Sequence, residues 1–261
     1  MNTIDKKFRE LKRQKKKAFI VFITAGDPNL SVTKRLILEF EKSGVDLIEI
    51  GIPFSDPLAD GPTIQASSSR ALKNKVTLHS IIRAVSSLKK RVKIPMVFMT
   101  YYNPVFNYGL KKFVSDCKRA GVSGVIVPDM PYEESYDLLK IAKKADFSLI
   151  FLAAPTSTRE RLVKISKLSQ GFIYFVSLTG VTGARKMLPG DLVENVKRLK
   201  RLTKKPVCVG FGVSCPKQAK NVARIADGVI VGSAVIKQIE KGNFKKMSSF
   251  VRKLGKAIHE V

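Results

Sequence analysis

Two carboxylates in the segment over 47–61 are the residues best suited to acid–base chemistry. The segment reads LIEIGIPFSDPLADG, which predicts an apolar strand followed by a loop that prolines stiffen. Because side chains alternate along a strand, Glu49 shares a face with Leu47 and Gly51 and is the only charged residue on it. Asp60 lies at the far end of the loop, just before a Gly-Pro pair. A half-buried acid and a second acid on a stiff loop suit proton transfer.

Both acids also have a purely structural interpretation, and spacing alone does not decide between the two. A glutamate near a strand end is often simply solvated or ion-paired. An aspartate shortly before a proline is a common start signal for a helix, which would make Asp60 the N-cap of a helix beginning at Pro62. The position of both residues in the fold decides whether they can act together.

Short apolar segments alternate with longer amphipathic segments along the chain. The apolar segments predict strands, and most are continuous apolar runs, as in parallel sheets that are covered on both faces. These segments are 18–24, 45–51, 95–101, 124–128, 148–153, 172–177, 206–210 and 228–232. Helical periodicity separates them, over 32–42, 63–72, 78–90, 110–120, 133–143, 159–168, 192–202, 216–225 and 244–258.

Eight βα units in 261 residues predict an α/β fold, a (β/α)8 TIM barrel. An extra N-terminal helix over 3–15 precedes the first strand, and two helical segments between strands two and three imply one inserted helix. No linker or change of composition divides the chain, so we predict a single domain over residues 1–261. A doubly wound open sheet is the alternative fold, but it explains only the alternation and not the count of eight.

Polar residues follow the strand ends, where the active sites of such barrels lie. Glu49 is near the end of the second strand, and Tyr101 is at the end of the third. Asp129 follows the fourth strand, and Tyr174 lies within the sixth. The barrel would bring all of them to one rim.

Glycines cluster after the last three strands, at 180 and 183, at 210 and 212, and at 232. Loops after the last strands of a barrel often bind phosphate together with a helix N-terminus, and Ser233 adds a hydroxyl donor. Any one of these sites is explained by an ordinary turn, but three in these loops together predict a phosphate site. Gly210 and Gly212 also resemble half of a dinucleotide fingerprint. Cys215 stands where the third glycine belongs, so we do not predict NAD binding.

The net charge of +27 is high for an enzyme that acts on small molecules, and it raises the alternative of a nucleic-acid-binding module. The basic residues are interleaved with apolar residues at helical spacing, without an aromatic series, so we interpret them as solvated helix faces. The three cysteines, Cys117, Cys208 and Cys215, show no CxxC spacing. They predict buried thiols in a reducing cytoplasm and no metal site. The apolar run over 18–25 fits a buried strand better than a signal peptide, and no run is long enough to span a membrane.

The chain resembles the tryptophan synthase alpha subunit family along essentially its full length. The segment over 47–61 carries the most specific match. Supporting matches are FITAGDP at 22–28, MTYYNP at 99–104, VPDMP at 127–131, GVTGA at 180–184, GFGVS at 210–214 and GSA at 232–234. The resemblance implies a barrel that cleaves indole-3-glycerol phosphate to indole and glyceraldehyde 3-phosphate. It also implies an α2β2 assembly with a PLP-dependent beta subunit that receives the indole, and no cofactor on this chain.

The resemblance also implies roles for individual residues. Glu49 would be the proton shuttle, and Asp60 would be the partner of the indole N–H. The residues around the indole ring and the rest of the substrate would be Phe22, Tyr101, Tyr174 and Phe211. Those at the phosphate would be Gly183, Gly212, Gly232 and Ser233.

Further implied roles concern two loops. Thr182 would belong to a loop over 178–188 that closes over the substrate, and Asp129 would help to latch it. Asp56 and Pro57 would lie in the loop that signals to the beta subunit. Given the charge of this chain, such a partner would need a matching acidic surface.

The chemistry of this cleavage agrees with the residue types. A proton must reach a ring carbon, and the resulting positive charge on the ring nitrogen needs a carboxylate nearby. Glu49, on an apolar face, should have a raised pKa, whereas Asp60 should stay ionised. A different phosphate-binding barrel enzyme would explain the glycines but not the two acids. A non-catalytic relative that only activates a beta subunit predicts a lost acid, and both acids are present.

Overall fold

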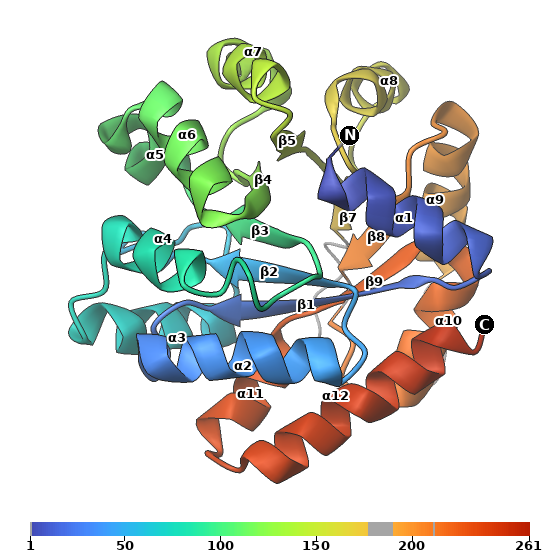
Figure 1. Cartoon of the computed structure of the whole chain (residues 1–261). Coiled ribbons are helices and arrows are strands. Elements are labelled where there is room, and N and C mark those ends of the chain that lie inside the picture. The colour runs from blue at the N-terminus through green and yellow to red at the C-terminus, as the bar shows by residue number, and fades with distance from the viewer. Residues whose placement is uncertain (1, 177–189, 211) are drawn as a thin grey trace.

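A computed structural model of the chain describes residues 2–176, 190–210 and 212–261. Its strands form one parallel sheet in the order β5-β4-β3-β2-β1-β9-β8-β7-β6, and helices surround it (Figure 1). The strands are β1 (Ala18–Thr24), β2 (Leu47–Gly51), β3 (Met96–Met99), β4 (Val122–Ile126), β5 (Ser148–Ile150), β6 (Leu152–Ala153), β7 (Ile173–Val176), β8 (Val207–Gly210) and β9 (Gly228–Val231).

The two strands at the ends of this order, β5 and β6, are consecutive in the chain. β5 pairs with β4 and β6 pairs with β7, so the ring of strands closes through the backbone at Phe151. The segment over 148–153, predicted as one strand, is divided because the Phe151 N–H donates to the Ser169 side chain at 3.1 Å instead of to a strand. The TIM barrel is thus confirmed, and the doubly wound open sheet is wrong.

The helices of the described residues surround the barrel, and α1 (Thr3–Arg13) closes one of its ends (Figure 1). They are α1 (Thr3–Arg13), α2 (Leu30–Lys42), α3 (Pro62–Lys73), α4 (Leu78–Ser86), α5 (Tyr102–Tyr108), α6 (Leu110–Ala120), α7 (Tyr136–Lys144), α8 (Arg159–Leu168), α9 (Gly190–Leu202), α10 (Pro216–Ile225), α11 (Ser233–Glu240) and α12 (Phe244–His259). The extra N-terminal helix and the helix inserted between strands two and three are both confirmed. None of these helices is long and apolar enough to cross a membrane.

Two helices, α5 and α11, are not among the predicted helical segments. The segment over 102–108 forms α5, although it contains a proline and only Val105 of its side chains is buried. Its start is stabilised from outside, because the Asp129 carboxylate accepts from the Tyr102 N–H at 2.9 Å. That contact joins residues far apart in sequence, so local periodicity gives no sign of it.

The interior of the barrel is apolar toward its N-terminal end, which is closed. Inward-facing side chains of the strands form a core with Ile4 and Leu11 of α1, which lies across that end (Figure 1). The Asn2 side chain fastens the start of α1 by donating to the Ser123 carbonyl at 2.8 Å. A site inside the barrel must therefore open at the C-terminal rim.

Candidate active site

Glu49 lies on the inner face of β2 and is completely buried, with 0% of its surface exposed. The strand register places it between Phe22 of β1 and Val97 of β3. Neither carboxylate oxygen has a hydrogen-bond partner among the described residues. Burial, together with the negative charge of Asp60, raises the pKa of Glu49 from 4.5 to about 8. The predicted rise is confirmed, and the side chain is mostly protonated at neutral pH.

Small residues around Glu49 leave space for the Phe22 ring in the mouth of the barrel. A Cβ at Gly51 would lie 2.5 Å from Cζ of Phe22, so only glycine fits there. On the other side, a Cβ at Gly232 would lie 3.4 Å from the Phe22 Cβ. The ring therefore lies between β2 and the end of β9, next to the buried acid.

Asp60 is half-buried at the end of the loop that follows β2. Burial raises the pKa of its carboxyl group, and hydrogen bonding by the Tyr101 hydroxyl opposes the rise. Tyr101 is fixed in place, since its hydroxyl accepts from the Ala59 N–H at 2.9 Å and its ring stacks on Phe54 at 5.2 Å between centroids. The N-cap of α3 is Gly61, so the interpretation of Asp60 as an N-cap is wrong.

Tyr174 completes the inner face of the mouth from β7. A Cβ at Gly210 would lie 2.8 Å from its hydroxyl oxygen, so glycine on β8 makes room for the phenol. Burial and the nearby carboxylates of Glu49 and Asp60 raise the pKa of Tyr174. The phenol is thus a neutral hydrogen-bond donor close to both acids.

Three of the predicted phosphate residues, Gly212, Gly232 and Ser233, follow β8 and β9. Gly232 is the N-cap of α11, and Ser233 is its exposed first residue. The first N–H groups of a helix have no partner within it and favour an anion. Gly212 has a φ of +33°, in the left-handed region that favours glycine. The backbone here suits a phosphate group.

The remaining predicted residues fall into two groups. Asp129 is exposed and caps α5, while Asp56 and Pro57 lie in the exposed part of the loop after β2. Thr182, Gly183 and Phe211 lie outside the described residues, as does the loop over 178–188. Among the described residues, no group of three or more His, Cys, Asp or Glu side chains is arranged to hold a metal ion.

Sequence reasoning missed residues that shape the site without reacting. Phe54 supports Tyr101. Gly210 was predicted only as part of the phosphate site, and its contact with Tyr174 was missed. Thr24 has a buried hydroxyl without a hydrogen-bond partner among the described residues. Its position was recoverable, because Thr24 shares the inward-facing parity of Phe22 on β1 and pairs with Gly51.

Comparisons with known proteins agree on one family. A family model described as tryptophan synthase alpha chain matches residues 8–260. The tryptophan synthase alpha chain of Geotalea daltonii is 49% identical over 95% of this chain and 94% of its own length. That of Caldanaerobacter subterraneus is 46% identical over 100% of both chains. The crystal structure of tryptophan synthase subunit alpha from Legionella pneumophila is similar with a TM-score of 0.93, at 35% identity over 100% of both chains.

Proposed function

The chain belongs to the tryptophan synthase alpha chain family, and from this we propose that Glu49 and Asp60 carry out its reaction. The protein is a carbon–carbon lyase of tryptophan biosynthesis that cleaves indole-3-glycerol phosphate to indole and glyceraldehyde 3-phosphate. The observation that carries the assignment is the buried Glu49 carboxyl group in the barrel mouth, with its pKa raised to about 8.

In the proposed mechanism Glu49 acts first as an acid and then as a base. It donates its proton to the indole ring carbon that carries the glycerol chain, which places positive charge on the ring nitrogen. The bond between the ring and the chain then breaks, and its electron pair restores the aromatic ring. The neighbouring glycerol hydroxyl becomes the aldehyde and returns a proton to Glu49. A pKa of about 8 makes both protonation states accessible near neutral pH.

Asp60 is proposed to stabilise the positive charge on the indole nitrogen. Its place beside Tyr101 supports this role, because hydrogen bonding by the Tyr101 hydroxyl favours the ionised carboxylate. A carboxylate held in place before the charge develops lowers the barrier more than a mobile one. These steps use side chains of this chain alone, and we propose that it needs no cofactor.

The rest of the substrate fits the surroundings of the two acids. We propose that the indole ring packs against Phe22 and Tyr101, together with Phe211, and that Tyr174 lies beside the substrate. The phosphate would accept hydrogen bonds from the backbone N–H groups of Gly212, Gly232 and Ser233, together with Gly183. The positive end of α11 supports this assignment. We also propose that Thr182 belongs to a loop that closes over the substrate and that Asp129 helps to latch this loop.

Family membership implies a beta subunit as partner, and we propose an α2β2 assembly in which PLP belongs to the beta subunit. Among the described residues, the exposed large hydrophobic side chains are Leu58, Phe106 and Tyr136. They follow β2, β3 and β4, three neighbouring strands, so they lie along one side of the rim. Leu58 is next to the proposed signalling residues Asp56 and Pro57 and is 84% exposed. This apolar side suits a docking surface.

The free cysteines bear on where in the cell the protein works. Cys117 and Cys208 are buried free thiols, which supports the cytoplasm as the proposed location.

The alternative of another phosphate-binding barrel enzyme is not favoured, since it does not explain why Glu49 is buried beside Asp60. The same holds for a basic nucleic-acid-binding module.

The test of the proposed function is release of indole from indole-3-glycerol phosphate by the purified chain, with and without a cognate beta subunit. We expect indole in both cases, with faster release in the complex. A folded chain that releases no indole in either case would contradict the assignment.

A further inference from the structure

A buried carboxylate near the rim joins three segments of the barrel. Asp27 follows β1, is 3% exposed, and lies where the chain enters α2. It accepts a hydrogen bond from the Ser67 hydroxyl at 2.6 Å and two from Arg70, at 2.9 Å from Nε and 2.7 Å from Nη2. The third guanidinium nitrogen, Nη1 of Arg70, donates to Glu240 at 3.0 Å. We call these four residues the Arg70 clamp.

The clamp connects the two helices that begin at opposite ends of the proposed substrate. Ser67 and Arg70 lie on α3, which starts at Pro62, two residues after Asp60. Glu240 is the last residue of α11, whose first residue, Ser233, is at the proposed phosphate site. α3 and α11 pack side by side (Figure 1). A shift of either helix along the other would change the separation between Asp60 and the phosphate-binding backbone.

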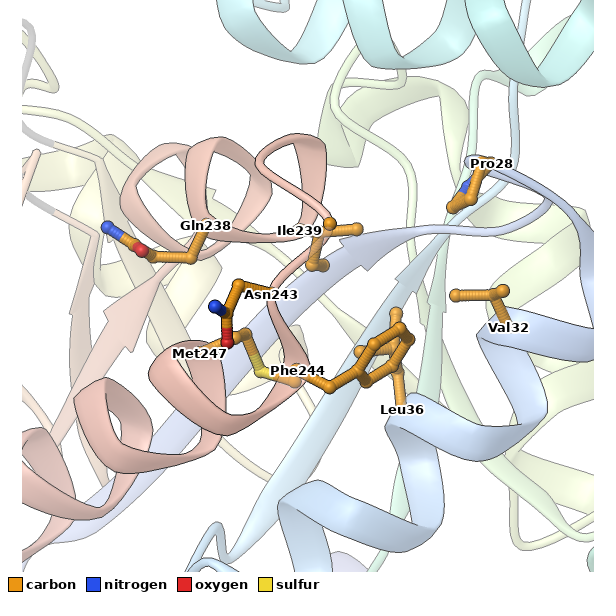
Figure 2. Close-up of a pocket in the computed structure, with 9 residues that line it drawn as sticks. Pro28, Val32, Leu36, Gln238, Ile239, Asn243, Phe244 and Met247 are labelled. Atoms are coloured by element: carbon orange, nitrogen blue, oxygen red, sulfur yellow. The ribbon is translucent and has the colours of Figure 1, made fainter.

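The flank of α11 that faces α2 and α12 is incompletely packed. A cavity of about 50 Å³, partly open to solvent, lies there, lined mainly by apolar side chains (Figure 2). Ile239 of α11 faces Val32 and Leu36 of α2 across it, and Phe244 and Met247 of α12 form its other wall (Figure 2). The Arg70–Glu240 ion pair, on the side of α11 that faces α3, adds a directional contact to the packing of α11 against β1 and α12.

We propose that Arg70 is a positioning residue that fixes the separation between Asp60 and the phosphate-binding N-terminus of α11. The guanidinium suits this task because its planar fork binds the Asp27 carboxylate through two nitrogens and still has a third for Glu240. The inference rests on the proposed function, since it assigns the phosphate to α11. It adds a residue that touches no substrate but determines how well both ends of the substrate are held.

The test uses Arg70→Lys and Glu240→Gln, with Arg119→Lys as the matched control. Lysine keeps the charge at position 70 but loses the fork, whereas glutamine at 240 weakens only the link to α11. Arg119 also pairs with a carboxylate, that of Asp116, but both lie on α6. For each protein we would measure urea unfolding, the Kd for glycerol 3-phosphate, and kcat and KM for indole-3-glycerol phosphate.

For Arg70→Lys we expect the Kd for glycerol 3-phosphate to rise and kcat to fall by about tenfold. This is less than the ~10²-fold cost of misplacing a reacting group by about 1 Å. For Glu240→Gln we expect KM to rise about threefold with kcat nearly unchanged, because Asp27 keeps its partner. Arg119→Lys should match the wild type in all three measurements.

The proposal is overturned if folded Arg70→Lys keeps the wild-type Kd and kcat, or if Arg119→Lys shows the same losses. If Arg70→Lys does not fold, Glu240→Gln decides: a raised KM supports the clamp, and a wild-type KM overturns it. A wild-type chain that releases no indole would overturn the proposed function, while the glycerol 3-phosphate affinities would still test the clamp.

Discussion

Replacing Glu49 with glutamine should make the folded protein more stable, and the gain should grow with pH. The pKa of Glu49 is about 8 in the folded protein against an ordinary value of 4.5. Between these values the folded chain keeps a proton that the unfolded chain has lost, so the free energy of unfolding falls as pH rises. The stability that comes with the neutral form is complete below pH 4.5 and is lost as pH rises through about 8. Glutamine is neutral throughout and carries no such loss.

The size of the stability gain follows from the shift in the pKa of Glu49. One pH unit is worth about 1.4 kcal/mol, so a shift from 4.5 to about 8 corresponds to about 5 kcal/mol in all. Glu49 is 0% exposed, so solvent does not screen the penalty. The assay is urea unfolding of both proteins at about pH 5 and about pH 9. The stability difference between Glu49→Gln and wild type should grow by about 4 kcal/mol across this range.

The comparison of Glu49→Gln with wild type removes the contributions of the titratable groups that do not interact with Glu49, because these contributions are the same in both proteins. Glu134→Gln is a suitable control because it makes the same substitution at an exposed position. A stability difference for Glu49→Gln that changes with pH no more than that of this control would refute the reasoning. It would mean that the folded protein does not desolvate the Glu49 carboxyl group.

Three further predictions follow from the site. The kcat/KM for indole-3-glycerol phosphate should fall as pH rises above about 8, because Glu49 must carry the proton, and a pH–rate profile checks this. Gly212→Asp should abolish measurable binding of glycerol 3-phosphate in calorimetry, since it places a carboxylate at the proposed phosphate site; unchanged affinity would show that Gly212 is only a turn residue. Leu58→Asp should weaken association with a beta subunit by roughly tenfold in a titration while leaving indole release by the chain alone unchanged. Equal affinities of Leu58→Asp and wild type would exclude this side of the rim as the docking surface.

Local patterns predicted the parts of the fold that depend on local rules. Period-2 alternation placed Glu49 on the same face as Leu47 and Gly51, and in the structure this is the buried inner face of β2. The burial raises the pKa of Glu49. The Gly-Pro pair after Asp60 predicted where α3 begins. In each case a few consecutive residues determine the outcome.

The parts that could not be predicted depend on contacts between distant segments. α5 forms because Asp129 caps it from the loop after β4, and the strand over 148–153 is divided because the Ser169 side chain accepts from the Phe151 N–H. The burial of Asp60 beside Tyr101 likewise joins two different loops. Asp27 and Arg70 are 43 positions apart, so no short sequence motif predicts their bidentate ion pair.

The most direct test of the account is the rate of indole release by wild type and Glu49→Gln under identical conditions, with folding checked by circular dichroism. Glutamine keeps the shape of the side chain and cannot exchange the proton. We expect the rate to fall by at least ~10²-fold, the lower end for a positioned acid–base group, while the substrate still binds. Near-wild-type turnover by folded Glu49→Gln would contradict the assignment of Glu49 as the proton shuttle.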